Sequence, residues 1–301
     1  MTFHAKDNLR GILLMVAGMA LFALEDTFIK LAAADMPAGF VLMFIGLFGI
    51  PFFWAMARAQ GQRVLVREAF HPAVIGRNLG EMLGTFGFVT ALTLAPLADV
   101  SAVAQAMPLF VTMGAALFLG ETVGWRRWTA IVVGFLGVLL VIRPGLAGFD
   151  PDLLWALLAV VGLGGRDLFT RRVPQSITTM QLSVWAFMAV VLLGAGMVVA
   201  SGGVHLPGPW QMLWMVCASV VGIAAYWALT QANRLGELSV ITPFRYSRIL
   251  FALVLGIAVF GERPDILTLC GAAVIVGSGI YTFARERAAR QRALSMTAPT
   301  R

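Results

Sequence analysis

Ten stretches of about 20 mostly apolar residues, joined by short polar connections, limit most strongly what this chain can fold into. A helix of that length crosses the roughly 30 Å hydrocarbon layer of a bilayer, because each residue adds about 1.5 Å. Hydrophobic residues fill 59% of the 301 positions and charged residues only 12%, which is too apolar for a soluble domain. The sequence therefore predicts an all-α polytopic membrane protein with spans at residues 11–31, 38–57, 73–94, 97–119, 126–143, 152–170, 178–200, 210–231, 237–260 and 265–283.

The positive charges between these spans predict the orientation of the chain. If the N-terminus is cytoplasmic, Lys30, Arg143 and Arg263 lie outside, Arg245 and Arg248 lie within a span, and the other 17 of the 22 Lys and Arg residues lie inside. Cytoplasmic loops retain Lys and Arg, so we expect both termini in the cytoplasm and an even number of spans. The first span is long enough to cross, and we expect it to be retained and not cleaved as a signal peptide.

Short motifs of the first half recur in the same order in the second half, 137–141 positions later. Each half holds five spans, an odd number, so the second half enters the membrane from the opposite side. The predicted organisation is two inverted five-helix repeats, residues 1–145 and 146–284, followed by a basic cytoplasmic tail, 285–301. The recurring motifs are Asp26–Lys30 with Asp167–Arg171, Ala91–Thr93 with Ala228–Thr230, Ser101 with Ser239, and Gly120-Glu121 with Gly261-Glu262.

Two long segments carry a resemblance to a known family. The stretch ALTLAPLADVSAVAQAMPLF, from Ala91, and the stretch ALTQANRLGELSVITPFRYS, from Ala228, each continue to a closing Gly-Glu. With the P-L-A-D-V-S entry and the mid-helix Pro108, they resemble the two halves of an EamA-type transporter of the drug/metabolite transporter (DMT) superfamily. The resemblance covers almost the whole chain. It implies ten helices, a central substrate cavity lined mainly by the first four helices of each half, and movement of a metabolite across the inner membrane.

Other function classes lack the motifs that they need. The sequence has no HExxH, GxSxG or P-loop and no Cys/His metal spacing, so we expect no catalytic residues, no metal and no cofactor. The net charge of +7 is explained by topology and does not indicate a nucleic-acid partner. Three alternatives stay open: an integral-membrane enzyme acting on a lipid or lipid-linked substrate, a channel, and a sensor or scaffold.

Acidic residues inside the spans are candidate functional groups, because burying charge in hydrocarbon is costly. Glu25 and Asp26 lie near the outer end of the first span, and Asp167 is the repeat counterpart of Asp26. They could act in gating or proton coupling. Alternatively, the aspartates anchor the interface, paired with Lys30 and Arg171 one turn away.

The ninth predicted span carries Thr242, Arg245 and Arg248, which share a helix face at spacings of three. A guanidinium matches the geometry of a carboxylate or phosphate, so either arginine could bind an anionic group of a substrate. The alternative is that each arginine pairs with Glu81, Asp26 or Asp167 and holds the bundle together. Four further polar or aromatic residues are candidates for lining a cavity. They are Gln105, Tyr226, Trp227 and Gln231.

The sequence thus predicts a secondary transporter that moves a small organic metabolite, anionic or zwitterionic, by alternating access across a bacterial-type inner membrane. The predicted substrate-binding residues are Arg245, Arg248, Thr242, Glu81, Gln105, Tyr226, Trp227 and Gln231, and the predicted gating or proton-coupling residues are Asp26, Asp167 and Glu25. The expected partners are the substrate and membrane lipids. Proton coupling and a homodimer are compatible with the sequence, which does not reveal the substrate, the direction of transport or the coupling ion.

Overall fold

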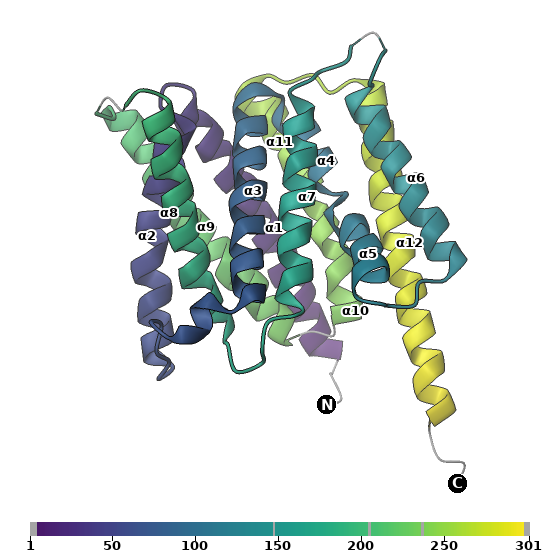
Figure 1. The fold of residues 1–301 in the computed structure, drawn as a ribbon. Helices are drawn as coiled ribbons and strands as arrows, with labels where there is room; N and C mark the ends of the chain where they lie inside the picture. The colour runs from purple at the N-terminus through teal and green to yellow at the C-terminus, as the bar shows by residue number, and fades with distance from the viewer. Residues whose placement is uncertain (1–4, 147, 204–205, 236–237, 298–301) are drawn as a thin grey trace.

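The computed structural model describes residues 5–146, 148–203, 206–235 and 238–297, and all its regular elements over those ranges are helices. Most of the helices run side by side in one bundle, with α1 beginning and α12 ending at the same end (Figure 1). We call that end the termini end and the other the far end. The elements are α1 (Ala5–Ala33), α2 (Ala38–Ala59), η1 (Arg67–Phe70), α3 (Pro72–Leu94), α4 (Leu97–Ala104), α5 (Met107–Phe118), α6 (Trp125–Ile142), α7 (Leu153–Thr170), α8 (Thr179–Ala200), α9 (Pro209–Leu235), α10 (Leu238–Ile241), η2 (Thr242–Ser247), α11 (Arg248–Phe260) and α12 (Ile266–Thr297).

Nine segments within the described residues are long and apolar enough to cross a membrane. The third predicted span, α3, has 23 residues and runs alongside α7, but it is not among the nine. Arg77, Asn78 and Glu81 lower its hydropathy. The all-helical polytopic fold is confirmed, and α3 is the tenth long element of the bundle.

Two of the predicted spans are broken near their middle. The fourth is interrupted at Gln105 and Ala106, between α4 and α5, and Pro108 follows the break. The ninth consists of the short α10, the 3₁₀ segment η2 and α11, with Pro243 inside η2. Proline has no backbone N–H, so it cannot complete the hydrogen bond to the carbonyl four residues earlier. The mid-helix Pro108 indicates the first break, and Pro243 lies at the second, within the predicted span 237–260.

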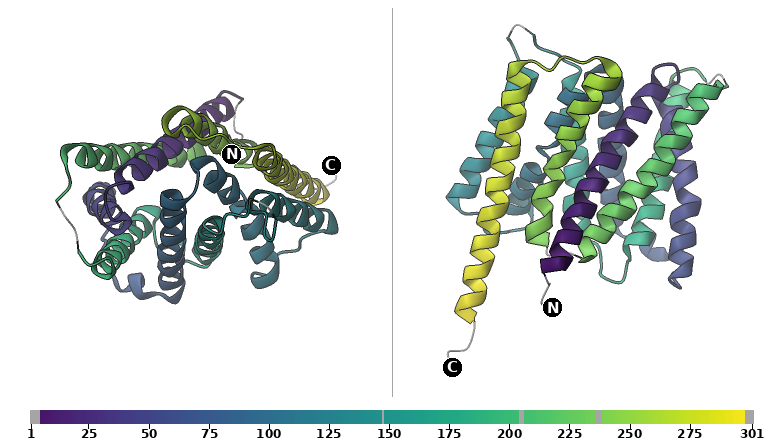
Figure 2. Two further views of the ribbon diagram at one scale, coloured as in Figure 1. Left: turned by 90° about the horizontal axis from the view of Figure 1, so that it is seen from above. Right: turned by 180° about the vertical axis from the view of Figure 1, so that it is seen from behind.

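The most extensive helix–helix contacts join helices from different halves of the chain. They form between α1 and α9, α3 and α7, α2 and α8, and α6 and α12. Figures 1 and 2 show the α2–α8 pair at one edge of the bundle and the α6–α12 pair at the other. The two halves are therefore packed through each other and do not form separate bodies.

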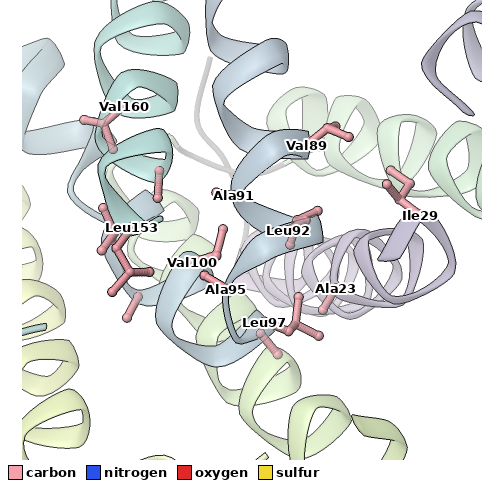
Figure 3. Close-up of a cluster of buried hydrophobic side chains, with 14 of the residues drawn as sticks. Ala23, Ile29, Val89, Ala91, Leu92, Ala95, Leu97, Val100, Leu153 and Val160 are labelled. Atoms are coloured by element: carbon pink, nitrogen blue, oxygen red, sulfur yellow. The ribbon is translucent and has the colours of Figure 1, made fainter. Parts of the chain in front are cut away.

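The core lies where α1, α3, α4 and α7 meet. Figure 3 shows Ala23, Leu92, Leu97 and Leu153 converging there from these four helices, and all four side chains are buried. Lipid tails are as apolar as leucine, so such contacts stabilise a membrane bundle through close packing more than through the hydrophobic effect. Close packing of these side chains is therefore expected to stabilise the bundle.

The recurring Gly-Glu pairs end helices in the same way in both halves. Gly120 and Gly261 have φ of 70° and 65°, a left-handed conformation that glycine adopts without strain. The next residue then donates its backbone N–H to a carbonyl six residues earlier. Glu121 donates to Ala115 at 3.2 Å and Glu262 to Gly256 at 3.0 Å. The motif thus has a structural role in stopping the helix.

The last candidate membrane span, Ile266–Arg285, agrees with the predicted span 265–283. The helix itself, α12, continues to Thr297 and extends beyond the bundle (Figure 1). Residues 298–301 of the predicted tail, and residue 237 at the predicted start of the ninth span, lie outside the described residues.

The α3–α7 contact provides a test of backbone packing. A Cβ added at Gly162 would meet the backbone of Gly84, whereas a Cβ at Gly165 of the same helix would meet nothing within 4 Å. We expect Gly162→Ala to lower the free energy of unfolding by about 1–3 kcal/mol, because the two backbones must separate. Thermal unfolding of the purified protein in detergent measures this. Gly165→Ala is the matched control, and an equal loss of Tm in both variants would contradict the packing argument.

Candidate functional site

A buried ion pair joins α1 to α11. Arg248 donates from Nη2 and Nε to Oδ2 of Asp26 at 2.6 and 3.2 Å, and the Asp26 side chain is 4% exposed. The guanidinium also lies 5.4 Å from the ring centres of Phe22 and Phe88. Two hydrogen bonds and two aromatic faces satisfy much of this buried charge. The alternative that Arg248 pairs with Asp26 is therefore confirmed.

A second charge cluster lies where α3 crosses α7. Arg166 contacts Glu81 at 3.1 Å and Asp167 at 2.8 Å, and Arg77 lies 3.6 Å from Glu81. Two arginines and two carboxylates balance one another within the bundle. The predicted candidates Glu81 and Asp167 are thus partners of Arg166, and a role for either in binding or gating stays a prediction.

Arg245 lies near both of these clusters. Electrostatic interactions with Asp167, Arg166 and Arg248 all reach it, so it is close to both. Among the described residues, however, it forms no hydrogen bond and no ion pair. A guanidinium presents five N–H donors, and a partly buried guanidinium without hydrogen-bond acceptors costs free energy. A role for Arg245 in binding an anionic group stays a prediction.

Two cavities lie within the bundle, and Tyr226 lines both. One, of about 30 Å³, lies among α2, α8 and α9 and is lined by Phe53, Trp227 and Gln231 among others. The other, of about 80 Å³, is lined by Phe22, Glu25, Ile45, Gly49, Phe187, Ser219, Gly222, Ile223 and Tyr226. The Tyr226 hydroxyl forms a 2.8 Å hydrogen bond with the Ser183 hydroxyl.

Two further ion pairs lie at opposite ends of the bundle. At the far end, Lys30 contacts Glu262 at 3.4 Å, and the two side chains are 17% and 10% exposed. Glu262 also accepts the backbone N–H groups of Leu97 and Ala98, at 2.6 and 3.1 Å, at the start of α4. At the termini end, Arg171 pairs with Glu121, and both side chains are nearly half exposed. The ion pair at the far end is therefore mostly buried, whereas the pair at the termini end is about half exposed.

Loop residues outside the spans add one more pair at the far end. Arg143 pairs with Asp265, and hydrogen bonds from the Arg143 side chain and the Thr268 backbone hold the pKa of Asp265 below its usual range. Among the described residues, no group of three or more His, Cys, Asp and Glu side chains is placed to hold a metal ion.

The structure places the predicted residues in different surroundings. Tyr226, Trp227 and Gln231 line a cavity, although Trp227 is 50% exposed. Gln105 is buried at the break between α4 and α5, and Thr242 begins η2. The expected alternative that Lys30 and Arg171 pair with Asp26 and Asp167 does not hold, because each reaches a glutamate of the other half of the chain instead.

Sequence reasoning missed the apolar walls of the second cavity. Phe22, Phe187 and Gly222 carry no charge, and no spacing marks them. It also missed the Lys30–Glu262 pair, although both residues belong to the recurring motifs from which the repeat was inferred. The shared motifs were the one signal that could have linked them.

The Asp26–Arg248 pair generates a stability prediction. We expect Asp26→Asn to lower the free energy of unfolding by about 2–4 kcal/mol, because Arg248 would keep its charge without a counter-ion. Adding Arg248→Gln should restore part of the loss. The matched control is Glu121→Gln, which breaks an exposed pair and should cost less than about 1 kcal/mol. Denaturation in detergent micelles measures all four proteins, and equal losses for the two single carboxylate variants would contradict the role of burial.

Comparison with known proteins agrees with this architecture. The EamA-like transporter family matches residues 9–143 and again residues 151–284. An S-adenosylmethionine uptake transporter of Rickettsia felis is 26% identical over 72% of this chain and 73% of its own length. A riboflavin transporter of Rhizobium johnstonii is 26% identical over 81% and 78%, and a pseudopaline exporter of Pseudomonas aeruginosa is 27% identical over 88% and 93%.

A solved crystal structure shares the fold. It superposes with a TM-score of 0.60 at 21% sequence identity and covers 93% of this chain and 99% of the other. The family match extends over most of the sequence, and the relatives are small-metabolite transporters by name. This chain therefore belongs to the EamA-like transporter family of the DMT superfamily and is a multi-pass membrane protein that transports a small metabolite.

Proposed function

We propose that this protein moves an anionic or zwitterionic metabolite across the cytoplasmic membrane by alternating access, with both termini in the cytoplasm. The observation that carries the anionic preference is Arg245, which lies in the broken ninth span without a hydrogen bond or ion pair to any described residue. Interrupted helices in transporters supply polar groups to substrate sites near the membrane midplane. Arg248 is committed to Asp26, so Arg245 is the arginine available to a substrate.

The inverted repeat is part of this proposal and has three kinds of support. In the α1–α9 pair, the first long helix of the N-terminal half packs against the third long helix of the other half, and in the α3–α7 pair the third packs against the first. A two-fold relation between the halves would produce this arrangement. Lys30 and Arg171 are counterparts, as are Glu121 and Glu262, so the two end pairs correspond to each other. The helix stops at Gly120 and Gly261 have matching geometry. The proposed halves are residues 1–145 and 146–284.

Alternating access is supported by the difference between the two ends. A symmetric pair of halves has two equivalent arrangements, one sealed at each end. Here the Lys30–Glu262 network is buried and the Arg171–Glu121 pair is exposed. With the termini in the cytoplasm, this arrangement is the inward-facing state. The direction of net transport, coupling to protons and a homodimer stay predictions.

The relatives support a metabolite larger than an inorganic ion. Their names give S-adenosylmethionine, riboflavin and pseudopaline as cargo, and one is an exporter while another is an uptake transporter. We infer that this chain carries an organic molecule of comparable polarity, and that its cavity residues determine which one. The proposal includes no catalytic step.

The first experiment is a ligand-stabilisation screen of the purified full-length protein with anionic, zwitterionic and cationic metabolites. S-adenosylmethionine and riboflavin are included among the compounds. We expect an anionic or zwitterionic compound to raise the Tm by about 2–4 °C, and Arg245→Gln to abolish that shift, because the guanidinium supplies the counter-charge. Arg126→Gln, which removes an exposed arginine, is the matched control. Stabilisation that survives in Arg245→Gln would contradict the anion-binding role.

A second experiment tests the seal at the far end. In protein lacking Cys217 and Cys270, a cysteine placed at the buried Ala98 reports access from that side. We expect Glu262→Gln to raise the rate of labelling by an impermeant maleimide roughly tenfold, because it weakens the bonds to Lys30 and to α4.

Glu121→Gln is the matched control for the seal, since it alters the equivalent residue at the termini end. It should leave the labelling rate at Ala98→Cys unchanged or lower it. Equal acceleration by both variants would mean that the far-end network does not control access.

A further inference from the structure

Glu25 occupies the second cavity in an unusual setting for a carboxylate. It lies on α1 beside Asp26, and the walls around it are mainly aromatic and aliphatic. Gly222 of α9 lies directly opposite, so close that an added Cβ would collide with the Glu25 carboxylate oxygens. The absence of a side chain at position 222 is what leaves room for this carboxylate.

No described residue satisfies the Glu25 carboxylate with a hydrogen bond or an ion pair. The nearest cation, Arg248, gives its hydrogen bonds to Asp26. Of the cavity's hydroxyls, that of Ser219 donates to the carbonyl of Met215, and that of Tyr226 pairs with Ser183. A carboxylate held in an apolar cavity without a partner is costly, and a positively charged ligand would remove that cost.

At the corresponding position of the other half of the chain, the charged side chain has an ion-pair partner. Arg166 lies 141 positions after Glu25, and Gly222 lies 141 positions after Glu81. At the α3–α7 crossing, Arg166 and Glu81 form an internal ion pair at 3.1 Å. At the α1–α9 crossing, the charged residue faces a glycine and a cavity. The α3–α7 crossing thus contains both an arginine and a glutamate, whereas at the α1–α9 crossing Glu25 faces a glycine with a cavity beside it.

We propose that Glu25 binds a positively charged group of the transported molecule, an ammonium or a similar organic cation. Phe22, Phe187 and Tyr226 line the same cavity, and aromatic faces attract organic cations. A metal ion would need several oxygen ligands, which these walls do not supply.

This inference rests on the proposed function and narrows it to a zwitterion. Arg245 would take the anionic group and Glu25 the cationic group of one molecule. Arg248 acts electrostatically on both residues, so both lie near the Asp26–Arg248 pair. A substrate with one charge alone would leave one of the two sites empty.

The test uses choline and its uncharged isostere, 3,3-dimethyl-1-butanol, with purified full-length protein. Choline tests the Glu25 site alone, because it carries no anionic group, and its charge does not depend on pH. We expect saturating choline to raise the Tm of the wild type by about 2–4 °C and that of Glu25→Gln by nothing measurable. The isostere should have no effect on either protein. Arg245→Gln should keep the full response to choline, so failure of the anion site and failure of this site are distinguishable.

Gly222→Ala provides a second variant that leaves the carboxylate in the chain. Its added methyl group should displace Glu25 and abolish the response to choline. Gly277→Ala is its matched control, because a Cβ there meets nothing within 4 Å. If choline fails to stabilise the wild type, the proposal is overturned, and Glu25 would then serve protons only. An equal response in the wild type, Glu25→Gln and Gly222→Ala would overturn it as well.

Discussion

Charged side chains lose their hydration when they enter a membrane bundle, and the rest of this structure depends on how that loss is offset. Asp26 and Arg248 offset it for each other, and Arg166 does the same for Glu81 and Asp167. These pairs join α1 to α11 and α3 to α7, helices that are distant in sequence. They therefore hold the two halves of the chain in register. Glu25 and Arg245, by contrast, have no hydrogen bond or ion pair to a described residue, which is why we propose them as the groups that meet the cargo.

The same constraint explains the two broken spans. A continuous helix satisfies its own backbone, so it offers a ligand little besides side chains. The interruptions at Gln105–Ala106 and at η2 place irregular backbone inside the bundle, where neighbouring helices cover it. At the far end, Glu262 accepts two backbone N–H groups at the start of α4, where a helix leaves its first N–H groups without an intrahelical partner. One carboxylate thereby links a helix start, a lysine of α1 and the loop before α12.

Much of the architecture was predictable, because each piece of evidence is local in sequence. Apolar runs gave all ten predicted spans; nine of them correspond to described segments that are long and apolar enough to cross a membrane, and the run at 73–94 forms α3. Pro108 indicated a break because a missing donor is a property of the residue itself. Pro243 has the same property, but the 3₁₀ geometry of η2, which packs against α1, α11 and α12, is not visible in the sequence.

The candidate site was predictable only in its residue types. Burial cost marked Arg245, Arg248, Asp26, Glu81 and Asp167 as unusual, but it could not say which would pair. Arg248 pairs with Asp26 across 222 positions, whereas Arg245 has no hydrogen bond or ion pair to a described residue. Glu25 and Asp26 are adjacent in sequence, yet their side chains leave the helix about 100° apart and meet different surroundings. That angular difference separates a salt-bridged residue from a cavity residue.

The sequence by itself determined that this chain spans a membrane as a helical bundle, because hydropathy and helix length are properties of contiguous residues. It also determined the family, through motifs that recur in both halves. Only the tertiary structure decided which charges are neutralised and which face a cavity. The reason is physical: a charge is satisfied by whatever lies within about 3–4 Å, and those neighbours come from distant parts of the chain. The empty space opposite Glu25, left by a glycine on another helix, is a property of that packing alone.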